Sequence, residues 1–212
     1  MSLIIEPLIF NAFQVNTYFV YAENKECLVV DAACYDRDEQ KQLSTFIEQH
    51  NLKPVRHINT HCHVDHVLGN SFLFHTYGIK PEIHIDALYH LEPLVDHAAT
   101  FGFEIDEVVY PDKYLDDGQK ISIGGHEIEI LHTPGHAAGS VCLKHDADRW
   151  VITGDLIFHG SIGRTDLPSG NLETLLNSIH EKIFVLEDDF KLYPGHGHPT
   201  SVGFERNNNP FL

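Results

Sequence analysis

The sequence has few basic residues and no long hydrophobic run, and each shortage excludes a class of partner. Its 212 residues include 14 Lys and Arg against 31 Asp and Glu, which gives a formal net charge of −17. This charge repels nucleic acids and anionic lipids, and no Lys or Arg cluster offsets it. An apolar run begins at Leu3–Ile5, but Glu6 and Pro7 end it far short of the ~18 residues of a membrane span. We therefore predict that the protein binds neither nucleic acid nor a membrane.

Cysteine is also scarce, and its placement does not suggest disulfide bonds. The four cysteines are irregularly spaced and form no Cys-x-x-Cys pair. In a chain large enough to form its own core, such cysteines are typical of reduced, buried thiols. The N-terminal residues also lack the basic stretch and long apolar segment of a secretory signal. The sequence therefore predicts a cytoplasmic protein.

The distribution of hydrophobic residues predicts one layered α/β domain. Hydrophobic residues make up 42% and charged residues 21%, an ordinary balance for a globular protein. Short β-branched runs alternate with helical patterns in two similar halves, without a linker or a fixed repeat. We therefore expect residues 1–212 to form one domain in which two sheets pack together with helices outside. The expected strands are 3–10, 17–21, 27–30, 55–59, 82–85, 120–123, 127–132, 140–143, 150–153 and 190–193, and the expected helices are 36–49, 67–77, 87–101 and 172–185.

Histidine is the residue type in excess, with 17 copies, more than Lys and Arg together. The loop after the expected strand 55–59 reads His61-Cys62-His63-Val64-Asp65-His66. Side chains two residues apart at a strand end point the same way, so His61 and His63 can bind one ion. Asp65 and His66 follow at the start of the next helix, where the chain has turned. They can therefore reach a second ion beside the first.

Three further candidate ligands also follow expected strands. They are His136 after 127–132, Asp155 after 150–153, and His196 after 190–193. Each of these features alone is typical of an ordinary turn. A rigid sheet, however, can hold ligands at its strand ends with the accuracy that a metal site requires. In combination and in this order, they predict a metal centre.

These residues resemble a known family. The run Thr60-His61-x-His63-x-Asp65-His66, followed by His136, Asp155 and His196, resembles the metallo-β-lactamase superfamily over nearly the whole chain. Shorter runs resemble its short glyoxalase II-like (hydroxyacylglutathione hydrolase-like) members: Gly163–Asp166, Pro194–Gly197, Gly203–Arg206 and Asn209–Leu212. The resemblance implies an αββα four-layer sandwich with the site along one edge. It also implies that His61, His63 and His136 bind a first metal, that Asp65, His66 and His196 bind a second, and that Asp155 bridges both.

This ligand set indicates hydrolysis by an activated water molecule. Two divalent cations about 3.5–4 Å apart can share one water and lower its pKa from ~15.7 toward neutrality, which gives a metal-bridging hydroxide as nucleophile. We expect two ions per chain, zinc in the first place, with iron and manganese as alternatives. Asp65 is expected to aim the nucleophile. Asp65 and Asp155 are therefore the predicted catalytic residues.

Leaving-group chemistry favours a small-molecule thioester as the substrate. A thiol with a pKa of about 8.5 departs as a thiolate without a general acid, whereas amines and alkoxides need a proton or strong metal stabilisation. The motif offers no dedicated acid, since His198 is expected to be a solvated loop residue. A true β-lactamase is disfavoured on the same ground.

The resemblance weakens where glyoxalase II binds glutathione. The residues after His196 are too few for the C-terminal helical domain that holds glutathione in that enzyme, so we expect no such domain. Arg164 occupies the position of a basic residue that contacts a glutathione carboxylate, but Thr165 and Asp166 depart from the neighbouring aromatic residue of that enzyme. Arg164 therefore has two alternatives, a substrate contact or an ion pair with Asp166. Hydroxyacylglutathione is one candidate substrate.

The sequence is also compatible with other functions. A persulfide dioxygenase-like enzyme would bind a single iron through His61, His136 and Asp155, but the run Pro194–Gly197 favours the hydrolase. A lactonase, an esterase or a non-catalytic metal-binding protein could also use this fold. A non-catalytic member should lack ligands, and here all seven positions are filled. The sequence assigns no oligomeric state.

Overall fold

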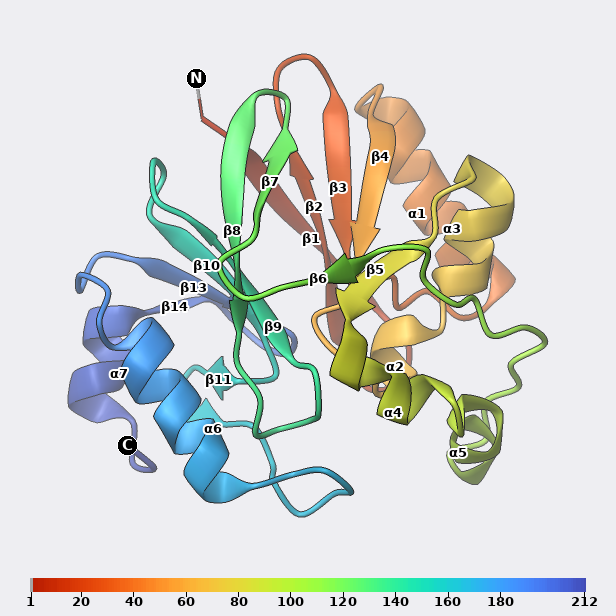
Figure 1. Ribbon diagram of the computed structural model, residues 1–212. Coiled ribbons are helices and arrows are strands. Elements are labelled where there is room, and N and C mark those ends of the chain that lie inside the picture. The colour runs from red at the N-terminus through yellow and green to blue at the C-terminus, as the bar shows by residue number, and fades with distance from the viewer. Residues whose placement is uncertain (1) are drawn as a thin grey trace.

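Two six-stranded sheets face each other in the structure, a computed structural model that describes residues 2–212 (Figure 1). The first sheet has the order β1 (Ile4–Phe10), β2 (Val15–Tyr21), β3 (Glu26–Val30), β4 (Lys53–Ile58), β5 (Pro81–His84) and β6 (Tyr114–Leu115). The second has the order β14 (Thr200–Ser201), β13 (Lys191–Pro194), β10 (Trp150–Gly154), β9 (Val141–His145), β8 (His126–His132) and β7 (Lys120–Ile123). A separate hairpin consists of β11 (Ile157–Phe158) and β12 (Ser161–Ile162).

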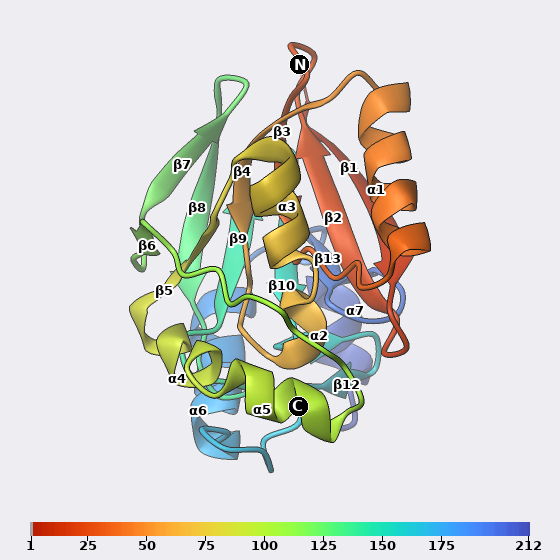
Figure 2. The same ribbon diagram turned by 90° about the vertical axis from the view of Figure 1, so that its right-hand side faces the viewer.

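Helices cover the outer faces of both sheets. Helices α1 (Arg37–Gln49) and α3 (Asn70–Tyr77) lie against the first sheet, and α6 (Leu172–Ser178) and α7 (Val202–Asn208) lie against the second (Figure 1 and Figure 2). The prediction of two packed sheets between helices is therefore confirmed. Among residues 2–212, no helix combines the length and the apolar character needed to cross a bilayer.

The central strands are buried on both faces, because each sheet packs against the other sheet on one face and against helices on the opposite face. All seven residues of β2 are buried. Tyr18 and Val20 pack in the apolar cluster between the sheets, whereas Phe19 and Tyr21 pack in the cluster under the helices. This alternation follows from the period of two along a strand. Close packing on both sides makes the sheets rigid, so the loops at their ends start from fixed positions.

Helix α1 begins where the sequence supplies a cap. The Asp36 side chain accepts hydrogen bonds from the backbone N–H groups of Asp38 and Glu39, which fixes the first turn. Leu43 and Ile47 lie one turn apart and are buried against the first sheet. The helix expected at this place is therefore confirmed.

The helix expected over 67–77 begins later, as α3, and a separate short helix, α2 (Val64–Val67), precedes it. Gly69 separates α2 from α3, at a point where the chain packs closely against the end of the first sheet. The Gly69 N–H donates to the Ala32 carbonyl at 2.8 Å, and a Cβ on Gly69 would lie 2.7 Å from Cys34 Sγ. This contact of Gly69 forms only in the folded protein, so the local sequence pattern could not predict it.

The other two long helices are also interrupted. The segment 87–101 forms a short 3₁₀ turn, η1 (Ile85–Ala87), and two helices, α4 (Leu88–Leu91) and α5 (Leu94–Thr100), which are separated at Pro93. Proline has no N–H to continue the hydrogen bonding of α4. Helix α6 continues only as a wider π-helical turn, η2 (Ile179–Ile183).

Candidate metal centre

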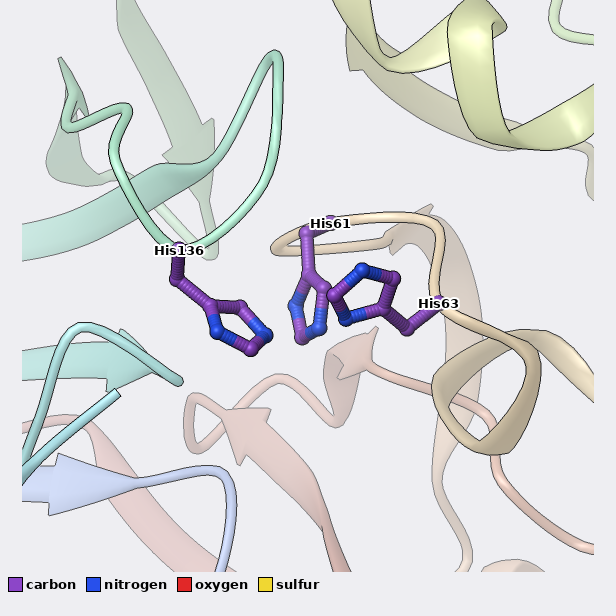
Figure 3. Close-up of side chains that lie close together, drawn as sticks. All are labelled: His61, His63 and His136. Carbon is purple, nitrogen blue, oxygen red and sulfur yellow. The ribbon is translucent and has the colours of Figure 1, made fainter. Parts of the chain in front are cut away.

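The predicted ligands meet at one end of the two sheets, on loops that leave the ends of strands. His61 and His63 follow β4, and Asp65 and His66 lie on α2 directly afterwards. His136 follows β8, Asp155 follows β10, and His196 follows β13. Figure 3 shows His61, His63 and His136 directed toward one another from two separate loops.

Three of these side chains form what we call the histidine group: His61, His63 and His136. Their ligand nitrogens all lie within 4.8 Å of one another. In each of the three rings Nε2 is buried and has no hydrogen-bond partner. Buried polar atoms in proteins are nearly always partnered, so three unpartnered nitrogens in one place need an explanation. A metal ion bound by three imidazoles fits this arrangement.

Three others form what we call the mixed group: Asp65, His66 and His196. The Nε2 atoms of His66 and His196 lie 3.3 Å apart. Asp65 Oδ2 lies 3.4 Å from His196 Nε2 and 3.7 Å from His66 Nε2. One carboxylate and two imidazoles around a common point are a donor set that zinc and several other divalent cations accept.

Asp155 lies between the two groups. Its Oδ2 is 3.6 Å from Nε2 of His136, in the histidine group, and 3.5 Å from Nε2 of His196, in the mixed group. Its Oδ1 is buried without a hydrogen-bond partner, 3.5 Å from His66 Nε2. Gly195 makes room for this arrangement, because a Cβ there would overlap Asp155 Oδ1 and His66 Cε1.

Burial and nearby charges shift the pKa values of the two groups in different directions. Desolvation lowers the pKa of His61 well below its usual value and that of His63 to about 3, and it also lowers the pKa of His136. These imidazoles are therefore neutral at pH 7, which is the form that binds metal. Burial opposes ionisation of Asp155, but His66 and His196 hold its pKa well below the usual range. Asp155 is therefore a carboxylate.

The histidines of the mixed group show the opposite behaviour. Burial favours the neutral forms of His66 and His196, but nearby carboxylates outweigh it. Asp155, Asp65 and Asp31 raise the pKa of His66 well above its usual value, and Asp155 and Asp65 raise that of His196 to about 9. The negative potential that stabilises these protons also attracts a divalent cation.

The sequence interpretation gave no role to Asp31, which orients the mixed group from behind. Asp31 is 1% exposed, and its carboxylate accepts hydrogen bonds from the Thr60 N–H and hydroxyl, both at 2.7 Å. Its Oδ2 also lies 3.0 Å from His66 Nδ1. A carboxylate on the outer nitrogen of a histidine fixes the ring and directs Nε2 inward. The sequence signal that could have revealed this role is the position of a carboxylate directly after the apolar strand β3.

Backbone carbonyls orient two other histidines. Nδ1 of His136 lies 2.8 Å from the carbonyl oxygen of Arg164, and Nδ1 of His196 lies 2.9 Å from that of Phe13. The Arg164 guanidinium donates two hydrogen bonds to the Asp166 carboxylate, each at 2.8 Å. The structure therefore shows the ion pair, and Arg164 also lines the cavity above the centre.

A cavity of about 390 Å³ opens above the two groups, a size that suits a small molecule. Its floor contains side chains of both groups and Asp155. Its walls come from three other regions of the chain: Phe13, the helical segment with His90, His97, Thr100 and Phe101, and the loop with Arg164, Leu167 and Pro168.

A third cluster of possible ligands, His84, Asp86 and His132, lies outside this centre. The rings of His84 and His132 are stacked, with centroids 3.9 Å apart and planes 8° apart. Ring nitrogens direct their lone pairs within the ring plane, so two parallel rings cannot both aim at one ion. Nδ1 of His84 accepts the Asp86 N–H at 3.3 Å and thereby caps η1. We assign this cluster a structural role.

Known proteins resemble the chain over its whole length. Residues 10–198 match the family model described as the metallo-beta-lactamase superfamily. A protein of Haemophilus influenzae named hydroxyacylglutathione hydrolase GloC is 34% identical over 98% of this chain and 97% of its own. The crystal structure of BLEG-1 B3 metallo-beta-lactamase has a TM-score of 0.88 and 29% identity, and covers 99% of both chains. The structure of TTHA1623 in a di-iron-bound form has a TM-score of 0.87 and 29% identity, over 98% of this chain and 100% of that one.

Proposed function

Because the chain belongs to the metallo-β-lactamase superfamily, we propose that it is a metal-dependent hydrolase of small-molecule thioesters, of the glyoxalase II-like type. The observation that carries this proposal is the position of Asp155 between the histidine group and the mixed group. One carboxylate shared by two ligand groups is the arrangement expected for a dinuclear centre. The similarity to a hydroxyacylglutathione hydrolase supports the thioester class. We further propose that residues 1–212 form one domain.

The side chains present fit two divalent cations. The histidine group offers three neutral imidazoles with unpartnered nitrogens, and the mixed group offers one carboxylate and two imidazoles. With Asp155 between them, this set of nitrogen and oxygen donors suits zinc, and iron or manganese as alternatives. When bound, such ions lower the pKa of water and polarise a substrate carbonyl.

Asp65 has the charge and position to orient the attacking water. Burial raises the pKa of this carboxyl, but His66 and His196 outweigh burial and hold it below its usual value. The ionised carboxylate can only accept hydrogen bonds. The carboxylate can therefore bind a metal ion and also accept a hydrogen bond from a water molecule. A lone pair of that water is then free to face the substrate in the cavity.

Asp65, Asp155 and His90, which line the cavity, are poor proton donors, and this favours a leaving group that departs as an anion. Asp65 and Asp155 are held ionised, so neither supplies a proton. Burial lowers the pKa of His90 to about 4, so this imidazole is neutral at pH 7 and is a poor general acid. A thiolate, with a conjugate-acid pKa of about 8.5, leaves readily under these conditions, whereas an amine does not.

The test is metal analysis combined with a panel of thioesters that includes S-D-lactoylglutathione, with release of the free thiol as the assay. We expect about two metal ions per chain and loss of turnover on chelation. Asp155→Asn should reduce both metal content and turnover by at least about tenfold. The exposed substitution Asp146→Asn is the matched control and should change neither.

Three results would contradict the proposal. One iron per chain, with stoichiometric oxygen uptake on glutathione persulfide, would establish the dioxygenase alternative. Turnover of β-lactams without turnover of thioesters would assign a different substrate class. A metal-loaded protein that hydrolyses no thioester, ester or lactone would indicate a non-catalytic metal-binding protein.

A further inference from the structure

The wall of the cavity that faces solvent is aromatic. Phe13, in the turn between β1 and β2, and Phe101, directly after α5, contact each other edge to face with ring centroids 5.7 Å apart. Their side chains are 43% and 56% exposed. Two large exposed rings beside a cavity leave apolar area in water that a bound apolar group would cover.

This aromatic wall is fixed relative to the metal centre. The Phe13 carbonyl oxygen lies 2.9 Å from Nδ1 of His196, a member of the mixed group. The Phe13 ring also packs against Phe103, which is buried, at a centroid distance of 5.9 Å. The rings therefore stand at a set position relative to the metal centre, where they can select the group attached to a carbonyl bound there.

Another part of the cavity wall offers little to an anionic ligand. It consists of Leu167, Pro168 and Arg164, and Arg164 is the single Lys or Arg among the described residues that line the cavity. Its guanidinium already donates both of its parallel hydrogen bonds to Asp166. The whole chain carries a net charge of −17, so long-range steering also disfavours anions. Among the described lining residues, glutathione, with two carboxylates and one ammonium group, therefore meets no Lys or Arg that lacks a carboxylate partner.

We infer that this pocket selects thioesters by an apolar acyl group packed against Phe13 and Phe101, and that it gives no preference to an anionic thiol such as glutathione. The inference rests on the proposed thioester hydrolysis. In that reaction water forms a bond to the acyl carbon and the carbon–sulfur bond breaks. The sulfur leaves with the electron pair, and the products are a carboxylate, a thiol and one proton released to solvent.

The first experiment compares matched substrates on the metal-loaded protein. Acetyl, hexanoyl and phenylacetyl thioesters are each made with glutathione and with uncharged N-acetylcysteamine. We expect kcat/KM to rise at least about tenfold from the acetyl to the phenylacetyl ester, because burying several apolar carbons has this order of effect on specificity. For one acyl group, the glutathione and N-acetylcysteamine esters should agree within about threefold at moderate ionic strength.

Two variants test the aromatic wall and the Arg164–Asp166 ion pair separately. Phe101→Ala should reduce the preference for phenylacetyl over acetyl esters by at least about fivefold. The matched control Tyr110→Ala removes an aromatic ring of similar exposure that does not line the cavity, and it should leave the ratio unchanged. Asp166→Asn should release the Arg164 guanidinium and raise kcat/KM for glutathione esters at least about threefold over uncharged esters.

The outcomes separate this inference from the function on which it rests. If no thioester is hydrolysed, the proposed function fails and the inference fails with it. If thioesters are hydrolysed but wild type prefers the glutathione ester more than about threefold over the N-acetylcysteamine ester of the same acyl group, only the inference is overturned. An unchanged acyl preference in Phe101→Ala overturns the assignment of the aromatic wall.

Discussion

Replacing Asp31 with asparagine should weaken metal binding although Asp31 is not one of the proposed ligands. The carboxylate accepts the Thr60 N–H with Oδ1, and it faces both the Thr60 hydroxyl and His66 Nδ1 with Oδ2. In asparagine the carbonyl oxygen can keep the first bond, but an NH₂ group replaces the second acceptor. To avoid two donors in contact, His66 would have to move its proton from Nδ1 to Nε2. Nε2 is the nitrogen that faces the mixed group, so the ring would be lost as a ligand.

The size of this effect follows from the bonds that are lost. Two hydrogen bonds to a buried charge, at ~1.5 kcal/mol each, amount to about 3 kcal/mol of folding stability. Loss of a carboxylate that orients a metal-binding histidine typically reduces metal affinity by about 10–100-fold. The thermal midpoint of the chelated protein should therefore fall, and the midpoint of the metal-loaded protein should fall further.

The assay is competition for zinc against a chelator of known affinity, together with thermal unfolding with and without metal. Asp189→Asn is the control, because Asp189 is exposed and pairs with Arg149 on the surface. It should change neither quantity. If Asp31→Asn binds zinc within about threefold of wild type, the argument that Asp31 orients His66 is refuted.

Three further predictions follow from buried contacts. Gly195→Ala should reduce metal content at least about tenfold, measured by elemental analysis, because the added methyl group overlaps Asp155; full occupancy would contradict the geometry. Glu205→Gln should lower the free energy of unfolding in urea by about 1–3 kcal/mol, since its carboxylate is fully buried among hydrogen-bond donors, whereas exposed Glu173→Gln should not. Burial lowers the pKa of His57 from 6.5 to about 3, so the unfolded chain takes up a proton first and His57 destabilises the fold as the pH falls below 6.5. The free energy of unfolding of His57→Gln in urea should therefore fall less steeply between pH 6 and pH 4 than that of wild type, by about 1.4 kcal/mol per pH unit. Equal slopes would show instead that His57 takes up its proton equally readily in the folded and the unfolded chain.

The sequence predicted the layers and the meeting place of the candidate ligands because both depend on local patterns. Apolar strands end at loops, and the loops of one sheet edge lie close together, so a histidine or aspartate just after each strand could be placed without coordinates. His61, His63 and His66 also share one short segment, which limits how far apart they can lie. The same reasoning puts Asp31 at this sheet edge, directly after β3, but does not reveal its role, because its contact with Thr60, 29 residues away, forms only through the pairing of β3 with β4.

The bounds of two expected helices were wrong for a related reason. Helical periodicity extended over 67–77 and 87–101, but a tertiary contact at Gly69 moves the start of the first helix to Asn70, and the missing N–H of Pro93 divides the second. The short helix α2 carries Asp65 and His66 of the mixed group, and Phe101, directly after α5, lines the cavity.

The C-terminal run acts on the centre through a chain of contacts that no local pattern contains. The Glu205 carboxylate accepts the Gly160 N–H, and Asn209 Nδ2 donates to the Ser161 carbonyl at 3.0 Å, so α7 holds the hairpin of β11 and β12 by its turn. The chain that leaves this hairpin places the Arg164 carbonyl 2.8 Å from Nδ1 of His136. A carboxylate buried without a cation is costly unless donors surround it, and here they do. Glu205→Gln should therefore loosen His136 as well as the fold, and zinc affinity should fall further than the loss of stability alone predicts.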